Sequence, residues 1–183
     1  RLRAITVDPA TVKPTQEALS ALSAAPRLTP VSSLPQKSRW LFTIQMTASQ
    51  ATAQASHLWE KTADGWRFIE EVNSPVARLK TQDTAEIASH GELRRYHRTQ
   101  SGITIDLRVT PERKLTGTLA AMGQTLPIEK PIPPETPVYP LGSPLIYYLG
   151  NLPLGEGYKT TLPLFSLQKQ DFAPVEVEVL GAE

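Results

Sequence analysis

The sequence of 183 residues contains no cysteine, little glycine, almost no net charge and no long apolar run. The lack of cysteine excludes disulfides, thiolate metal sites and cysteine nucleophiles, and it leaves the redox compartment undecided. A net charge of +1 gives no electrostatic reason to expect a nucleic-acid partner. No apolar run approaches the ~18 residues that a membrane-spanning helix needs. Because the chain begins at Arg1, we expect a mature or trimmed product whose signal segment is not visible.

Proline is the residue type that the sequence has in excess. The 17 prolines make up about 9% of the chain, against ~5% on average, whereas the 10 glycines are too few for a collagen-like chain. Six prolines crowd into residues 127–140, and Ser38–Leu126 holds only Pro75 and Pro111. Proline cannot donate a hydrogen bond within a sheet. We therefore predict a proline-rich extended arm over residues 1–38, a single β-rich domain over 39–183 and a stiff crossing at 127–140. Within the arm, Thr15–Ala25 has the composition of a short helix.

The middle of the chain has the two-residue period of strands that bury one face. Apolar residues alternate with polar ones in two runs: Trp40, Phe42, Ile44 and Met46, and Ile103, Ile105, Leu107 and Val109. Turn signals such as Asp64-Gly65 and Ser101-Gly102 separate strands at a spacing of about ten residues. No helical period interrupts this pattern. The prediction is a mainly β protein with a strongly curved antiparallel sheet, a half-barrel or open barrel.

The last third of the chain predicts one short apolar helix and two further strands. Ser143 suits the N-cap, Pro144 the first helical position and Gly150 the end, which places a helix at about residues 143–150. A helix so short and so apolar has to be buried, and we expect it in the concave face of the sheet. Tyr158–Phe165 and Pro174–Leu180 have the pattern of strands.

These residues carry a resemblance to a known family. Its elements are Ser143–Leu149, Leu152–Leu154 with Gly157, Leu162–Phe165 and Val175–Glu183, within residues 139–183. Together they are similar to a bacterial cell-envelope family of unknown function, which is related in fold to periplasmic lipoprotein carriers of the LolA/LolB kind. The resemblance implies a half-barrel with a helix in its concavity, able to hold acyl chains or an apolar partner segment. It also implies export to the periplasm or outer envelope, and no catalytic residues. Such domains usually continue with more strands, so we expect either a fragment or a sheet completed elsewhere.

Ionisable side chains are densest in the segment His90–Arg98. His90 and His97 fall on opposite faces of a regular strand, and no pattern brings His57 near them, so we predict no metal site. The basic residues have no wider basic field around them, which disfavours RNA. We instead expect three arginines to contact acidic groups of a neighbouring protein: Arg94, Arg95 and Arg98.

Residue pairs that suggest catalysis have simpler interpretations. Ser143 precedes a proline that lacks the N–H an oxyanion hole requires, so we interpret Ser143 as a helix cap. Glu70 and Glu71 are adjacent on a predicted strand, where they would face opposite ways and could not share a proton. Trp59 and Trp66 flank a predicted turn and are expected to pack as a cross-strand pair.

Three functional hypotheses follow. The leading one is a non-enzymatic envelope domain, without cofactor, that binds a lipid, acyl chain or apolar partner segment in its concave face. The residues expected to line that face are Trp40, Phe42, Ile44, Ile103, Ile105, Leu107, Leu145, Tyr148 and Leu149. The second is an accessory subunit of a larger assembly, peripheral to a membrane, which would use the arm and the open edge of a C-terminal strand bearing Glu176 and Glu178. The third and weakest is a hydrolase-type enzyme.

Overall fold

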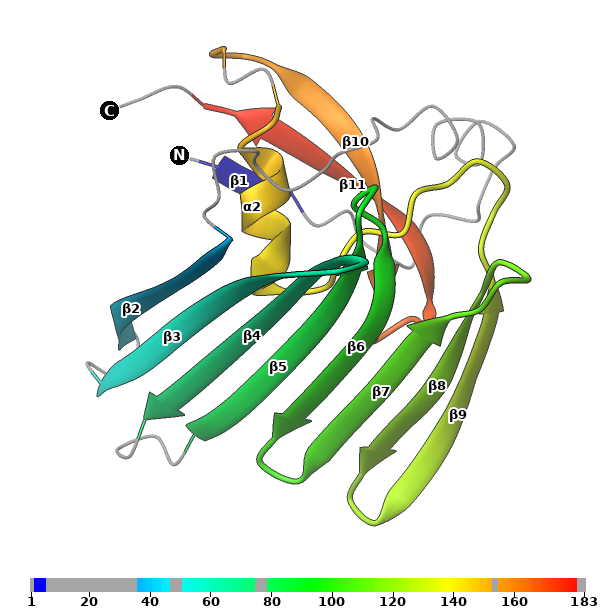
Figure 1. Cartoon of the computed structure of the whole chain (residues 1–183), viewed down its shortest axis with the longest axis horizontal. Coiled ribbons are helices and arrows are strands. Elements are labelled where there is room, and N and C mark those ends of the chain that lie inside the picture. The colour runs from blue at the N-terminus through cyan, green and yellow to red at the C-terminus, as the bar shows by residue number, and fades with distance from the viewer. Residues whose placement is uncertain (1, 6–35, 47–50, 75–78, 153–154, 181–183) are drawn as a thin grey trace.

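The structure, a computed structural model, describes residues 2–5, 36–46, 51–74, 79–152 and 155–180, arranged as two antiparallel sheets and one short helix (Figure 1). The strands of the large sheet are β2 (Lys37–Met46), β3 (Ala51–Thr62), β4 (Gly65–Ser74), β5 (Leu79–Ala88), β6 (Leu93–Gln100), β7 (Ile103–Val109), β8 (Lys114–Ala121) and β9 (Gln124–Pro131). The small sheet contains β1 (Leu2–Ile5), β10 (Lys159–Ser166) and β11 (Asp171–Val179). The helical segment is η1 (Ser143–Leu145) followed by α2 (Ile146–Leu149).

The large sheet is a meander in which each strand pairs with the next strand along the chain. It is open, with β2 and β9 at its two edges. The prediction of a mainly β protein with an open, curved antiparallel sheet is confirmed. Of the two runs with predicted alternation, the one in β7 has buried Ile105 and Leu107, whereas Phe42 and Ile44 in β2 stay 40% and 41% exposed. Trp59 on β3 and Phe68 on β4 are fully buried.

Tight turns set the register of the meander. Ser101 and Gly102 connect β6 to β7 with φ angles of 43° and 87°, as their sequence predicts for a two-residue hairpin. At the other predicted turn, Thr62 pairs directly with Gly65, so Gly65 already belongs to β4. A Cβ atom at Gly65 would lie 2.0 Å from the carbonyl oxygen of Ile87 on β5. Glycine is required there because the two backbones approach so closely.

The proline-rich crossing begins later than its sequence predicts. Pro127 and Pro131 belong to β9, which pairs with β8 along its length. An edge strand tolerates proline because one of its sides needs no hydrogen-bond donor. The irregular segment therefore covers residues 132–142, and its later part is largely buried.

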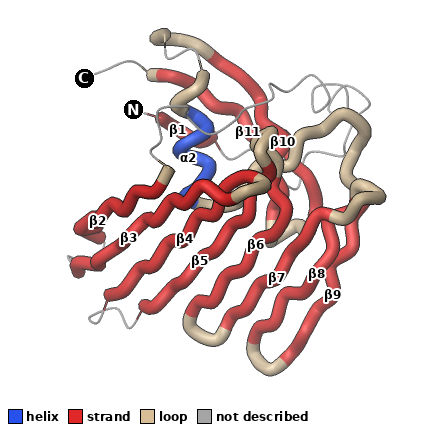
Figure 2. The backbone as a smooth tube through the Cα atoms, viewed as in Figure 1, coloured by secondary structure: helices blue, strands red, loops and turns tan. Residues whose placement is uncertain are grey.

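The short helix lies on the concave face of the large sheet, as predicted, and is drawn in blue in Figure 2. Its capping differs from the prediction. Gly142, with φ of 71°, occupies the cap position, and no side chain caps the turn. The Ser143 hydroxyl instead donates a hydrogen bond to Glu70 on β4, which ties the start of the helix to the sheet.

The small sheet corrects the prediction of an open C-terminal edge. Its order is β1-β11-β10, so β11 lies in the middle and is paired on both sides. Glu176 and Glu178 both form ion pairs with Lys159 of β10, at 4.0 and 3.0 Å. β1 comes from the predicted arm, whereas the helix predicted at Thr15–Ala25 lies outside the described residues.

One hydrophobic core joins the two sheets and the helix. It contains Trp59 and Phe68 from the large sheet, Tyr148 from α2, and Leu162 and Phe165 from β10. The Tyr148 hydroxyl donates to the backbone carbonyl of Gly91 over 2.9 Å. No described helix is long and apolar enough to cross a membrane.

Candidate functional site

The candidate site is a cleft of about 790 Å³ between the β2 edge of the large sheet and the short helix. Two apolar side chains of β2 remain open to it, since Phe42 is 40% and Ile44 41% exposed. Its complete lining is Trp40, Phe42, Thr43, Ile44, Ala55, His57, Glu70, Ser143, Ile146 and Tyr147. The cleft thus has mainly apolar walls with a small polar group, which is the usual composition of a small-molecule site.

Aromatic rings form the wall of the cleft beside the helix. The ring of Tyr147 lies 5.5 Å from that of Trp40 and 5.2 Å from that of Trp59, measured between centroids. Phe42 packs against the ring of His57, with 4.7 Å between their centroids. Pairs at these separations contribute about 0.5–1.5 kcal/mol each beyond the area that they bury. The helix is therefore anchored to the sheet through the same rings that line the cleft.

A hydrogen-bonded polar group lies at the base of the cleft. Glu70 Oε1 accepts a hydrogen bond from Ser143 Oγ over 2.7 Å and lies 2.9 Å from His57 Nε2. His57 Nδ1 is 2.9 Å from the hydroxyl of Tyr147. Burial raises the pKa of Glu70, but the hydrogen bonds from His57 and Ser143 outweigh it and hold that pKa below its usual value. Glu70 is therefore a carboxylate at neutral pH. Since a carboxylate only accepts, the proton on His57 Nε2 points toward it.

This polar group begins a row of ionisable residues across the concave face. His57, Glu70, Asp83 and Arg98 are direct partners on four neighbouring strands, β3 to β6. Asp83 accepts a hydrogen bond from the Tyr96 hydroxyl over 2.9 Å, and its second oxygen lies 3.5 Å from Arg98 Nε. Burial raises the pKa of Asp83, and it also raises that of Tyr96. The cross-strand register brings these four residues together.

The geometry of the polar group differs from that of a serine hydrolase. In a catalytic triad the histidine lies between the serine and the acid. Here the acid, Glu70, lies between Ser143 and His57. No hydrogen bond among the described residues joins Ser143 directly to His57. His57 is thus not placed to take a proton from Ser143. Nor do the described residues contain three His, Asp or Glu side chains grouped to hold a metal ion.

Only part of the predicted lining meets in the cleft. Trp40, Phe42 and Ile44 line it, as expected from their shared face of β2. The other predicted residues lie elsewhere: Ile105, Leu107 and Tyr148 are buried core, Leu145 and Leu149 pack partly buried against the core, and Ile103 borders another hollow. The prediction missed Ile146 and Tyr147, which share the exposed side of the helix, and the polar group of His57, Glu70 and Ser143. A polar residue at an inward position of an alternating strand was the available signal for Glu70.

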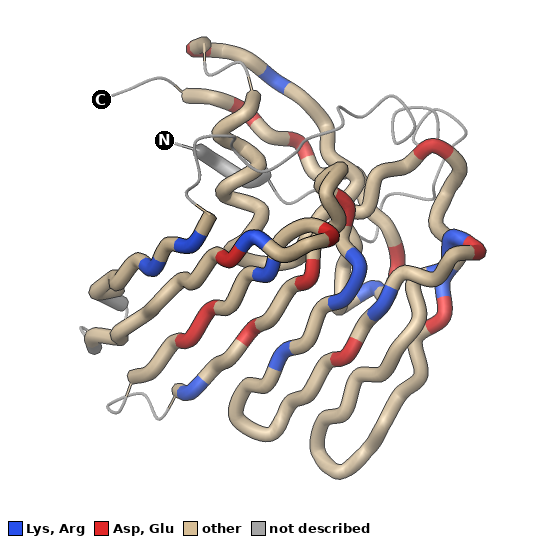
Figure 3. The backbone as a smooth tube through the Cα atoms, in the orientation of Figure 1, with Lys and Arg blue, Asp and Glu red and all other residues tan. Residues whose placement is uncertain are grey.

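The predicted arginine cluster is divided between the two faces of the sheet. Arg95 forms an ion pair with Asp106 at 2.8 Å, whereas Arg98 faces inward toward Asp83. Arg94 is exposed and lies at an irregularity in the β5–β6 pairing. Figure 3 shows acidic and basic positions interspersed along these strands, without a region of one sign. Basic and acidic positions are therefore mixed along these described strands.

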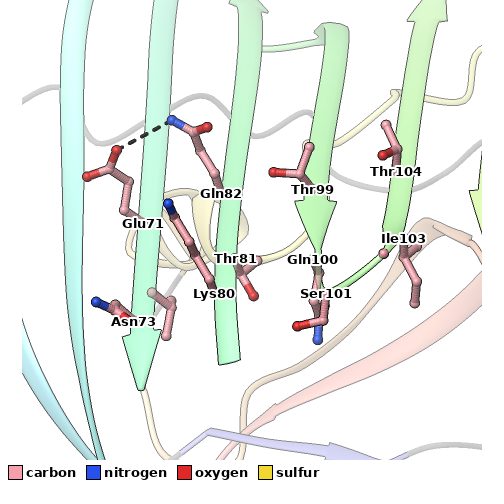
Figure 4. Close-up of a pocket in the computed structure, with 12 residues that line it drawn as sticks. Glu71, Asn73, Lys80, Thr81, Gln82, Thr99, Gln100, Ser101, Ile103 and Thr104 are labelled. Carbon is pink, nitrogen blue, oxygen red and sulfur yellow. Dashed lines mark hydrogen bonds between the residues drawn. The ribbon is translucent and has the colours of Figure 1, made fainter. Parts of the chain in front are cut away.

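A second hollow, of about 700 Å³, lies at the end of β4, the start of β5 and the turn between β6 and β7 (Figure 4). Its side chains are mostly polar and exposed. Gln82 on β5 donates a hydrogen bond to Glu71, its partner on the adjacent strand β4, over 3.4 Å. It is lined by Glu71, Val72, Asn73, Lys80, Thr81, Gln82, Thr99, Gln100, Ser101, Gly102, Ile103 and Thr104. Without aromatic or buried charged side chains, it is a weaker candidate than the cleft at β2.

In comparisons with protein-family models, curated proteins and solved structures, nothing matches this chain.

Proposed function

We propose that the protein binds an apolar ligand of the acyl-chain type in the cleft between β2 and the short helix. The observation that carries the proposal is the pair of half-exposed side chains, Phe42 and Ile44, facing a concave space beside Trp40. Large apolar side chains held open in a concavity expose surface that a ligand can remove from water.

The energetics favour binding of a long apolar chain. Each buried CH₂ group contributes about 0.8 kcal/mol, so covering eight carbons of a chain would yield about 6 kcal/mol before the entropy of association is subtracted. The cleft lies within the ~300–1,000 Å³ range of small-molecule sites. Twelve carbons would yield about 10 kcal/mol on the same basis, so we expect affinity to rise with chain length.

The role that we propose is binding without chemistry. In the arrangement of Ser143, Glu70 and His57, no hydrogen bond among the described residues joins the histidine to the serine, so the serine–histidine pairing of a hydrolase triad is not formed, which favours a binding domain over a hydrolase. The family resemblance of residues 139–183 is the basis for placing the protein in the periplasm or outer envelope of a bacterium, which remains part of the proposal. An apolar segment of a partner protein is the competing occupant. The described residues offer less support for an assembly role through β11, because β11 is paired on both sides.

The test measures binding of N-phenyl-1-naphthylamine, an uncharged apolar fluorophore, and its displacement by 1-dodecanol. Phe42→Ser should weaken binding about tenfold, which corresponds to the loss of ~50 Å² of apolar contact at ~25 cal/mol per Å². The matched control is Leu41→Ser, which changes the neighbouring residue on the opposite face, 76% exposed and outside the cleft lining. Absence of binding by the unaltered protein, or equal loss in both variants, would refute the proposal. A copurifying peptide that blocks the fluorophore would identify a partner segment as the occupant.

A further inference from the structure

We infer that the cleft selects amphiphiles with a cationic head, such as an ammonium or quaternary ammonium group attached to an apolar chain. This inference rests on the proposed function and specifies the chemistry of its ligand. It is carried by a buried carboxylate, Glu70, placed among aromatic rings in a lining that contains no basic side chain other than His57.

The first argument is the charge of the polar group. Glu70 is 9% exposed and lines the cleft. Its hydrogen bonds to Ser143 and His57 both use Oε1, and Oε2 has no hydrogen-bond partner among the described residues. With a neutral imidazole, His57 donates through Nε2 and accepts the Tyr147 hydroxyl at Nδ1, so the group then carries the charge of the Glu70 carboxylate, whose Oε2 is left to a ligand.

The second argument concerns the surrounding charges. Arg98, two strands from Glu70, lies 3.5 Å from the Asp83 carboxylate and also donates to Gln100, so it has partners of its own. On β2, which is separated from β4 by β3, Arg39 contacts Ser56 and Glu71, which face away from the cleft lining. The lining contains no lysine or arginine. An anionic head would therefore meet Glu70 without a compensating cation, which is unfavourable in a partly desolvated site.

The third argument is the set of aromatic rings near the carboxylate. Trp40, Phe42 and Tyr147 all line the cleft with Glu70, and the rings of Trp40 and Tyr147 are 5.5 Å apart. A cation within ~6 Å of such ring faces gains about 0.5–2 kcal/mol, with the larger values where water is excluded. Quaternary ammonium groups are bound by rings in this way, and a nearby carboxylate adds to the attraction. The apolar walls formed by Ile44 and Ile146 then accommodate the chain.

The experiment compares three ligands of nearly equal chain length that differ in the head: dodecyltrimethylammonium and 1-dodecanol, which have dodecyl chains, and dodecanoate, whose carboxyl group includes the twelfth carbon. For each ligand, the assay measures displacement of N-phenyl-1-naphthylamine from the full chain at neutral pH. Each ligand is kept below the concentration at which that ligand aggregates. We expect the ammonium ligand to bind about tenfold more tightly than the alcohol, and dodecanoate to bind most weakly. Glu70→Gln should remove this ranking, so that the affinity ratio of the ammonium ligand to 1-dodecanol falls about tenfold. The matched control, Glu71→Gln, alters the adjacent exposed carboxylate and should preserve the ranking.

The outcomes separate the inference from the proposed function. Equal affinities for the three heads, tightest binding of dodecanoate, or an unchanged ranking in a folded Glu70→Gln variant would overturn the inference and leave the apolar site standing. Failure of all three ligands and of the fluorophore would overturn the proposed function itself. If circular dichroism shows that Glu70→Gln does not fold, the inference is judged from the unaltered protein alone. Its preference for the ammonium head over the other two heads should then be present and should weaken in added salt.

Discussion

The hydrogen bond between Tyr148 and Gly91 provides the sharpest test of how the helix is held in the core. Tyr148→Phe removes one hydroxyl and leaves the ring, which is fully buried. The hydroxyl donates to the Gly91 carbonyl over 2.9 Å, and the variant leaves that buried acceptor without its partner. Loss of such a bond, with an unsatisfied group left behind, costs about 1–3 kcal/mol. For a chain of this size, Tm falls by about 2–4 °C per kcal/mol.

The assay is urea unfolding followed by tryptophan fluorescence and circular dichroism. We expect a lower midpoint with an unchanged dependence on urea, because the surface exposed on unfolding stays the same. Tyr158→Phe is the control, since Tyr158 is half-buried and its hydroxyl has no hydrogen-bond partner among the described residues. A change in the free energy of unfolding below about 0.5 kcal/mol for Tyr148→Phe, or an equal change in the control, would refute the reasoning.

Three further predictions concern the sheet and the polar group. Gly117→Ala should destabilise the protein by at least about 2 kcal/mol in urea unfolding, because its methyl group would lie 1.9 Å from the Asp106 carbonyl oxygen; Gly155→Ala, with open space around it, should change stability by less than about 0.5 kcal/mol. Since the folded-state pKa of Glu70 is held below its usual 4.5, its contribution to stability is present above that value and is lost as the pH falls through the folded pKa. The difference in unfolding free energy between the unaltered protein and Glu70→Gln should therefore shrink on acidification, and a constant difference from pH 7 to 3 would contradict this. Ser143→Ala should raise the pKa of Glu70 in an NMR titration and cost about 1 kcal/mol, and an unmoved pKa would show that the hydroxyl does not stabilise the carboxylate.

Local patterns were sufficient to predict the large sheet and the helix. The alternation around Ile105 and the turn at Ser101-Gly102 depend on side-chain direction and backbone freedom, which neighbouring residues determine. Tertiary pairing overrode local preference at Pro127, which lies in the edge strand β9. It also did so at β11, where the edge that was expected to be open pairs with β1 from the other end of the chain.

The site was predicted less well than the fold, for a related reason. Trp40, Phe42 and Ile44 belong to one strand, so their shared face follows from the sequence. Glu70 meets Ser143 across 73 positions of the chain, and no local pattern encodes that contact. Strand lengths and turn types together set which inward residues become neighbours, and an error of one residue would turn Glu70 outward.

The two sheets also imply a definite order of assembly. Every pairing in the large sheet joins strands that follow one another in the chain, so each hairpin needs only a short loop to close. One pairing of the small sheet is different, because Leu2 of β1 pairs with Val179, 177 positions further along, whereas β10 and β11 follow one another in the chain. Closing so long a loop is entropically costly until other contacts have drawn the ends together. We therefore expect the meander and the β10–β11 hairpin to form early and β1 to dock last, so that hydrogen-exchange protection during refolding appears in β3–β7 before it appears in β1.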